Sequence, residues 1–390
     1  MMPTITKNII IINLLFFFGG IVAESYGIDL SDYLGLHFFM ADHFNVVQLF
    51  SYMFLHGGFS HLFFNMFAVW MFGRILEETW GPKRFLFYYI ACGVGAGLIQ
   101  EVVQFIEYEM TLSAYNSVNI GTAIIPMDQY LNLMRTVGAS GAVYAILLAF
   151  GMTYPNQSLF IFPLPFPIKA KFFVAGYALI ELYSGFANNP NDNVAHFAHL
   201  GGMLFGLLFT GRKKIAMGQL ISEIKDFYKR GDVTAKLIFI NVALFVAITL
   251  LTVVFRLFKV EISGIFDALA LPASLDNLLV KPWSILTYMF MHADFFHILF
   301  NMLWLYWFGK LFLIFFSSKH LRGLYILGGL LGGLFYIASY NIFPYFRELI
   351  PFSNMVGASA SVLAIVLATA YREPNYPINL LFIGDRKSTR

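Results

Sequence analysis

The amino-acid sequence predicts an all-α protein that crosses a membrane several times. Of its 390 residues, 59% are hydrophobic and only 12% are charged, and the mean hydropathy is +0.71. An ordinary soluble domain carries about 25% charged residues. Long apolar runs recur along the whole chain, and a helix satisfies its own backbone hydrogen bonds in lipid whereas an open sheet cannot. These observations exclude a soluble protein, and no nucleic-acid-binding signature accompanies them.

Ten apolar segments are expected to be membrane spans. Six lie in the first part of the chain, at residues 8–24, 60–79, 85–104, 137–153, 170–187 and 195–211. Four follow, at residues 235–256, 295–316, 322–340 and 355–371. The first run is not interpreted as a signal peptide, because no small-residue cleavage site follows it and many spans come after it. The single cysteine, Cys92, can form no internal disulfide and is expected to be a packing residue.

The placement of Lys and Arg predicts the orientation. The loop at 25–59 carries acidic residues but no Lys or Arg, whereas Lys83 and Arg84 follow the second span and Lys169 and Lys171 follow the fourth. Cytoplasmic loops are enriched in Lys and Arg. We therefore expect a cytoplasmic N-terminus and an outer loop at 25–59. A compact first unit without a targeting extension favours the bacterial inner membrane.

An internal repeat divides the chain. Ser51–His56 matches Thr287–His292, and Val137–Val143 matches Val356–Val362, on either side of a polar stretch. We expect a complete six-span unit at 1–211, a cytoplasmic linker at 212–234, an incomplete four-span second unit at 235–384, and an aberrant or truncated tail at 385–390.

Ser140 lies in a run of small residues at the head of the fourth span. Small residues let helix backbones approach closely, so on this stretch alone Ser140 would be a packing residue. His199 in the sixth span precedes Gly202 by three residues and Gly206 by seven, which puts it on the small-residue face of its helix. The start of the fourth span is the expected neighbour of that face, so Ser140 and His199 are predicted to meet.

Three polar residues, His56, His61 and Asn65, open the second span. His61 and Asn65 are four residues apart and therefore share one helix face. Polar groups at this depth are costly unless they are paired or used, so a functional role is favoured for this pair. For His56 we favour interhelical hydrogen bonding over a functional role.

Two further polar residues are expected to lie outside the chemistry. His196, three residues before His199, is interpreted as a bystander near the aqueous boundary. Glu181, near the outer end of the fifth span, could be a proton relay, but a capping or interfacial role is favoured.

With these pieces in place, the sequence from His56 to Gly206 resembles the rhomboid intramembrane serine proteases. The matching motifs are His-x4-His-x3-Asn in the second span, Gly-Ala-Ser-Gly-Ala with a Tyr four residues after the Ser, and Ala-His-x2-Gly-x3-Gly in the sixth span. A Gly73-x3-Glu77-x3-Gly81 pattern ends the second span. The resemblance covers the first unit and, in weaker form, the second unit to about residue 383.

The resemblance implies a role for each matching residue. Ser140 would be the nucleophile and His199 the general base, a dyad without an acid, with Tyr144 stacked against the imidazole. His61, Asn65 and the backbone N–H of Ser140 would hold the oxyanion. The same resemblance gives supporting positions to His56 and Gly138, and it implies neither a metal nor a cofactor. Many relatives carry Trp-Arg in the first outer loop where Val47-Gln48 stand here, which leaves the loop's architecture open.

The second unit keeps only part of this set. It retains His292, His297, Asn301 and Ser359. Leu363 aligns with Tyr144, Leu313 and Ser317 align with Glu77 and Gly81, and no histidine follows Ser359. A nucleophile without its base should be inert, so we expect this copy to be catalytically dead. It is either the product of a truncated or shifted reading frame or an accessory module.

The expected function is an intramembrane serine endopeptidase that cleaves transmembrane segments of other membrane proteins. Its partners would be those substrates and the lipid bilayer; the oligomeric state is left open. The alternative is a non-catalytic rhomboid-like protein that binds or escorts transmembrane helices. A metal or haem protein built on His56, His61, His196 and His199 ranks last, because no acidic or Cys ligand is expected beside those histidines.

Overall fold

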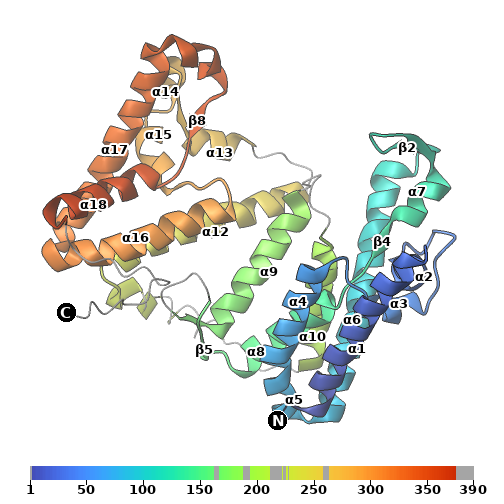
Figure 1. The fold of residues 1–390 in the computed structure, drawn as a ribbon. Coiled ribbons are helices and arrows are strands. Elements are labelled where there is room, and N and C mark those ends of the chain that lie inside the picture. Colours follow the sequence, from blue (N-terminus) through green and yellow to red (C-terminus); the bar gives the residue numbers. More distant parts are fainter. Residues whose placement is uncertain are drawn as a thin grey trace. The chain divides into compact units, whose positions relative to one another are not determined.

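The computed structural model divides into two compact units, Met1–Ile215 and Ala216–Arg390 (Figure 1). It describes residues 2–161, 167–187, 194–210, 228–257 and 263–374, together with residues 222, 225 and 226. Both units are helical, and the strands are short two-stranded pairings in loops. The chain is an all-α polytopic membrane protein.

The first unit is a helical bundle with two polar loops. Its long helices are α1 (Thr4–Ser25), α4 with its continuations η2 and α5 (Phe59–Ala68, Val69–Gly73 and Arg74–Trp80), α6 (Pro82–Glu107), α8 (Ser140–Thr153), α9 (Ala170–Ala187) and α10 (His196–Thr210). The loops contain α2 (Leu30–Leu34), α3 (Gln48–Ser51), η1 (Tyr52–Phe54), η3 (Tyr108–Leu112), α7 (Met127–Leu133) and the strands β1 (Leu36–His37), β2 (Ser117–Asn119), β3 (Ile124–Pro126), β4 (Arg135–Thr136), β5 (Ser158–Leu159) and β6 (Ile168–Lys169).

The second unit repeats the early part of this order. Its elements are α12 (Val233–Leu257), α13 (Ser263–Leu269), β7 (Leu271–Pro272), α14 (Leu275–Val280), α15 (Ser284–Thr287), η4 (Tyr288–Phe290), α16 (Phe295–Phe315), α17 (Ser318–Ile342), η5 (Pro344–Phe352), β8 (Asn354–Met355) and α18 (Ser359–Arg372). The expected linker at 212–234 and tail at 385–390 lie mostly or wholly outside the described residues.

A helix lies at each of the ten expected spans, but the helices differ in length. Six have the length and apolar composition to cross a membrane, and α8, α10 and α18 are shorter apolar helices. At 1.5 Å per residue, the 14 residues of α8 extend about 21 Å, less than a hydrocarbon core of about 30 Å.

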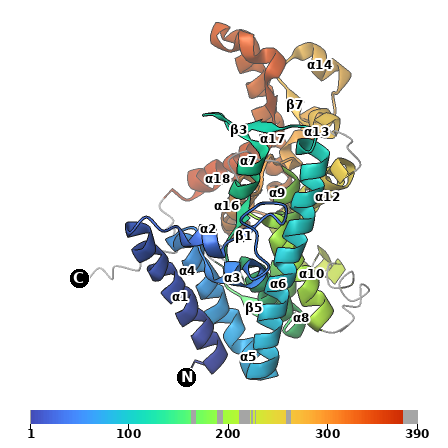
Figure 2. The same cartoon turned by 90° about the vertical axis from the view of Figure 1, so that its right-hand side faces the viewer.

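A close backbone contact joins α8 and α10 at the centre of the first unit. Helix α10 packs against both α6 and α8 (Figures 1 and 2). A Cβ on Gly202 would lie 1.9 Å from the carbonyl oxygen of Gly141, so no other residue fits at Gly202 without moving one helix. The surrounding core includes Tyr52, Tyr88 and the free Cys92, all buried as the sequence predicted for Cys92.

A buried carboxylate closes the end of the bundle at which α1 begins. Glu77 of α5 accepts hydrogen bonds from the backbone N–H groups of Ile5 and Thr6 at 2.9 and 2.7 Å, and from the Thr6 hydroxyl at 2.7 Å. A helix N-terminus leaves its first N–H groups without intrahelical partners. Glu77 supplies those partners, which is the physical reason for an acid at this place in the chain.

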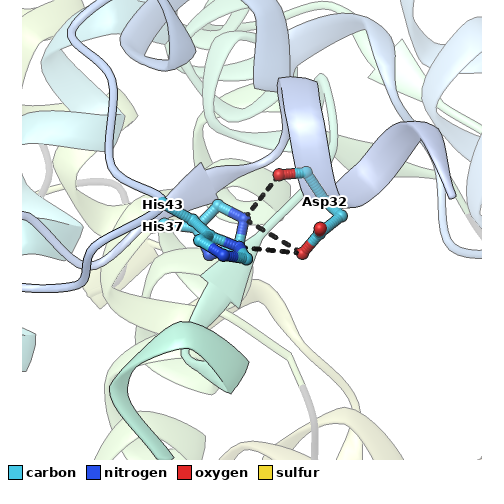
Figure 3. Close-up of side chains that lie close together, drawn as sticks. All are labelled: Asp32, His37 and His43. Atoms are coloured by element: carbon cyan, nitrogen blue, oxygen red, sulfur yellow. Dashed lines mark hydrogen bonds and ion pairs between the residues drawn. The ribbon is translucent and has the colours of Figure 1, made fainter. Parts of the chain in front are cut away.

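The loop between α1 and α4 is tied to the strand that leads to Ser140. Strand β1 pairs with β4 so that His37 lies opposite Arg135. Figure 3 shows the side chains of His37 and His43 around Asp32, where the His43 Nδ1 lies 3.3 Å from the Asp32 Oδ1. Arg135 reaches the same carboxylate at 3.7 Å and that of Asp29 at 2.9 Å.

Gln48 is the buried centre of this loop. Its amide donates to the carbonyl oxygens of Tyr33 and His43 at 3.2 and 2.9 Å. Its Oε1 accepts from the backbone N–H groups of His37 and Asn45 at 3.3 and 3.1 Å. The loop architecture that the sequence left open is therefore built by one glutamine with four backbone partners.

Candidate active site

Ser140 is the first residue of α8, and the chain enters it through a strained glycine. Gly138 has φ = 133°, a conformation that residues with a Cβ avoid. Its N–H donates to the carbonyl of Tyr52 at 2.9 Å, which fixes the turn. The Ser140 N–H lies at a helix N-terminus, where backbone donors lack intrahelical partners and favour negative charge.

The structure brings Ser140 and His199 together. The Nε2 atom of His199, which is 7% exposed, lies 2.7 Å from the Ser140 Oγ. Tyr144, one helical turn after Ser140, stacks on the imidazole with ring centroids 4.2 Å apart and planes 10° apart. A hydroxyl, an imidazole and an aromatic plate are thus held together by two helices.

The interpretation of Glu181 as a capping or interfacial residue, and of the histidine as lacking an acid, is wrong. Glu181 of α9 is buried, and its Oε2 lies 2.8 Å from the His199 Nδ1. The same oxygen lies 2.6 Å from the Nδ1 of His196, and the other oxygen accepts from the Tyr144 hydroxyl. His196 is therefore no bystander. The available signal was a lone carboxylate inside an apolar span, where an ionisable group is a functional candidate.

His61 and Asn65 lie on the opposite side of the serine. A Cβ built on Gly138 would be 2.8 Å from the His61 Nε2 and 3.5 Å from the Ser140 Oγ, so the imidazole and the hydroxyl border one small space. Asn65 is 6% exposed, and its amide donates to the His61 carbonyl at 3.0 Å. One N–H of that amide and the backbone N–H of Ser140 are the further donors that an oxyanion beside the hydroxyl would need.

The interhelical hydrogen bond expected of His56 is not found among the described residues. Within the described part of the chain, neither ring nitrogen of His56 has a hydrogen-bond partner. Its ring instead packs edge-on against His61, with centroids 5.0 Å apart. The contact that His56 makes with the site is therefore this ring contact with His61.

Two groups of described residues offer metal-ligand atoms within 4.8 Å of one another: Glu181 with His196 and His199, and Asp32 with His37 and His43. The expectation that no acidic ligand lies beside His196 and His199 is thus wrong. In the first group, both imidazoles lie within hydrogen-bonding distance of the carboxylate, and shared protons account for the spacing. In the second group, the Arg135 guanidinium already lies beside the Asp32 carboxylate. We assign hydrogen-bonding roles to both groups.

The second unit contains the counterparts of one side of this site only. His297 lies against Gly357 as His61 does against Gly138, and Asn301 donates to the His297 carbonyl at 2.9 Å. The His292 ring packs 5.1 Å from that of His297. Ser359 begins α18 and is exposed, and among the described residues no histidine is hydrogen-bonded to it.

Comparisons with known proteins show the family of the chain. A family model described as the Rhomboid domain matches residues 43–212 and 280–384, well over half of the chain. The chain is 26% identical over 161 residues to Rhomboid-like protein 16, chloroplastic, of Arabidopsis thaliana, covering 41% of this chain and 46% of that protein. It is 28% identical over 162 residues to Rhomboid protease AarA of Providencia stuartii, covering 40% and 52%.

A third relative is the Putative rhomboid protease YdcA of Bacillus subtilis (strain 168). The identity is 31% over 161 residues, covering 41% of this chain and 65% of that protein. The chain therefore spans between 46% and 65% of the length of these three relatives.

Proposed function

This chain belongs to the rhomboid family, and from that premise we propose that its first unit is a serine endopeptidase that cleaves transmembrane segments of other membrane proteins. The observation that carries the proposal is the 2.7 Å contact between the Ser140 Oγ and the His199 Nε2. A serine hydroxyl is a weak nucleophile until an adjacent base takes its proton. At this distance the imidazole is within reach of that proton.

The surroundings support the remaining steps of acyl transfer. As the Ser140 oxygen bonds to a substrate carbonyl carbon, negative charge develops on the carbonyl oxygen and needs preorganised donors. We assign that role to His61, Asn65 and the Ser140 N–H, which border the space beside Gly138. His199 then returns its proton to the departing amine, and water repeats the sequence to release the acyl group.

Substrate helices must open before this site can act on them. A carbonyl inside a regular helix is hydrogen-bonded and shielded, so we expect substrates with Gly, Ala or Pro near the scissile bond, where a helix unwinds at low cost. The short α8, which starts at Ser140, supports a cut in the outer part of the bilayer, where water is available for hydrolysis.

The two units are proposed to have different tasks. The first, 1–211, is the protease, and 235–384 is a catalytically inert rhomboid-like module that binds or orients transmembrane helices. Ser359 has no hydrogen-bonded histidine among the described residues, and Leu363 takes the place of the stacking Tyr144. We also propose a cytoplasmic N-terminus, from the distribution of Lys and Arg, and a bacterial inner membrane, because two of the three relatives named above are bacterial.

A labelling experiment tests the proposal. Purified full-length protein in detergent is incubated with a fluorophosphonate probe, which bonds covalently to an activated serine. We expect labelling of the wild type and of Ser359→Ala but not of Ser140→Ala, with cleavage of a single-span test substrate following the same pattern. A folded wild type that never labels would favour a non-catalytic helix-binding protein. Loss of label in Ser359→Ala alone would exchange the tasks of the two units.

A further inference from the structure

We propose that Glu181 is a positioning residue for His199, so that the first unit works through a Ser140–His199–Glu181 chain in place of a dyad. This inference rests on the proposed protease function. Its observations are independent of that function, because they concern the far side of the imidazole from the serine.

The three side chains form a continuous hydrogen-bonded line. The Ser140 Oγ lies 2.7 Å from the His199 Nε2, and the His199 Nδ1 lies 2.8 Å from the Glu181 Oε2. An ionised carboxylate only accepts hydrogen bonds. The proton of a neutral His199 is therefore held on Nδ1, and Nε2 is left with the lone pair that receives the serine proton. Glu181 selects the tautomer that the proposed reaction needs.

The carboxylate also fixes the ring in space. Its second oxygen accepts from the hydroxyl of Tyr144, the residue stacked on the His199 imidazole at 4.2 Å. The Glu181 carboxylate thus contacts both the His199 imidazole and the Tyr144 ring that stacks on it. Rotation of His199 about its side-chain bonds would break both contacts.

Burial makes a purely structural role for this acid costly. Glu181 is 6% exposed, and an unpaired buried carboxylate is strongly destabilising. Among the described residues, its hydrogen-bond partners all belong to the serine site or border it: Tyr144 of α8, and His196 and His199 of α10. Tyr177 lies one helical turn before Glu181 on α9, and its ring lies 6.1 Å from that of Tyr144. Glu181 therefore bonds to the proposed machinery and to no bracing cation among the described residues.

The proton transfers balance with Glu181 ionised throughout. When the Ser140 oxygen bonds to the carbonyl carbon, its proton moves to the His199 Nε2 and the carbonyl π electrons move to oxygen. The imidazolium keeps its Nδ1 proton and gains a charge-assisted hydrogen bond to Glu181. The Nε2 proton then passes to the amine nitrogen as the C–N bond breaks, and His199 is neutral again.

Glu181→Gln is the direct test, because the amide keeps the shape but loses the charge and can present an N–H to Nδ1. The readout is fluorophosphonate labelling of the full-length protein, divided into the maximal rate of bond formation and the probe concentration at half that rate. We expect the maximal rate to fall roughly 10²- to 10⁴-fold, with the half-saturating concentration and the thermal midpoint changed little. Residual label must remain on Ser140.

Glu101→Gln is the matched control. Glu101 is equally buried, at 6% exposure, and accepts a 2.7 Å hydrogen bond from the backbone N–H of Phe39, away from the serine. It should leave the maximal rate within about twofold. Equal losses in both variants would mean that Glu181 acts only through stability, and wild-type rates in Glu181→Gln would also overturn the inference. In both cases the proposed function stands, whereas an unlabelled wild type would remove the function itself.

A measurement on the unmutated protein covers the case in which Glu181→Gln does not fold. Histidine ¹⁵N NMR distinguishes the two imidazole tautomers, and the His199→Gln variant identifies the His199 signals by their loss. We expect neutral His199 to carry its proton on Nδ1. A proton on Nε2 would contradict the inference.

Discussion

The two units build the same frame around a serine at a helix start, although only the first completes a site. In the first, the Gly138 N–H donates to the Tyr52 carbonyl at 2.9 Å; in the second, Gly357 donates to Tyr288 at 2.9 Å. The two glycines have φ values of 133° and 117°. Both tyrosine hydroxyls then donate to a glycine carbonyl in the following long helix, at 2.7 and 2.6 Å.

The difference lies on the other side of the serine. Ser140 contacts His199, which in turn contacts Tyr144 and Glu181, whereas Ser359 is exposed and Leu363 stands in the place of Tyr144. The shared half also packs the unit, since the glycine turn and the tyrosine hydrogen bonds hold loop to helix. The half that is absent around Ser359 among the described residues is the half to which we assign the chemistry. The glycine turn and the tyrosine hydrogen bonds are thus present in the second unit, although no counterpart of His199 is found among its described residues.

The largest expected difference between the two units comes from replacing the serine of each with alanine. Ser140→Ala should lower the rate of substrate cleavage by at least about 10⁴-fold, because the nucleophile and base act as one unit. Ser359→Ala should leave it unchanged. Cleavage of a single-span substrate in liposomes measures both, and measurable activity that depends on Ser359 would break the comparison.

The two asparagines give the next effect. Asn65→Ala should lower the rate of cleavage about 10²- to 10³-fold, since one oxyanion donor is removed while the base remains. Asn301→Ala removes the matching amide from the second unit, where it donates to the His297 carbonyl, and should leave the rate of cleavage unaltered. Equal losses in the two variants would show that the amide acts by packing in both units.

The helix contact that brings the base to the serine should be sensitive to a single methyl group. Gly202→Ala places a Cβ 1.9 Å from the Gly141 carbonyl oxygen, and the required separation of the helices should cost about 1–3 kcal/mol of unfolding free energy. Gly176→Ala in α9 is the control, because nothing lies within 4 Å of its Cβ. Thermal unfolding in detergent compares them; an unchanged midpoint for Gly202→Ala would argue against the close contact.

Strands β1–β4 of the first unit correspond to β7–β8 of the second, and of these two pairings only β1–β4 carries charged residues. The stability of the first unit should therefore show a small dependence on pH. The residues of β7–β8 are uncharged. Burial raises the pKa of Asp29, but the Ser31 backbone N–H and the Arg135 guanidinium outweigh it and hold that pKa below its usual value of 3.8.

A lowered pKa in the folded state stabilises the fold above the usual pKa, and this contribution is lost as the pH falls through the folded value. At neutral pH, Asp29→Asn should therefore lower the free energy of unfolding by less than about 1 kcal/mol, because the site is exposed. The variant should unfold at a slightly lower temperature than the wild type. The difference should shrink below a pH of about 4. A difference that grows at acid pH would have the wrong sign.

The sequence predicts the contact between Ser140 and His199 because each residue lies among small residues of its own helix. Glycines three and seven residues after His199 mark the face that can approach another backbone. The ten helices follow from apolar runs in the same way. These features are local in the chain, so spacing alone reveals them.

Glu181, His196 and Gln48 could not be assigned from spacing. Glu181 acts on His199 from a third helix, and helical periodicity gives the face of a residue but not the neighbour that the face meets. Gln48 stands in a loop whose four partners are backbone groups, which leave no trace in residue identity. The errors therefore lie where three segments converge.

The contact between Gly202 and Gly141 has a mechanical consequence. Side chains between two helices can change rotamer and so absorb a small displacement, but a backbone atom facing a backbone atom has no such freedom. A tilt of α10 against α8 therefore changes the 2.7 Å distance between the His199 Nε2 and the Ser140 Oγ. The distance between the Ser140 Oγ and the His199 Nε2 thus depends on the angle between α8 and α10, and under the proposed function a bilayer that changes this angle is expected to change the turnover rate.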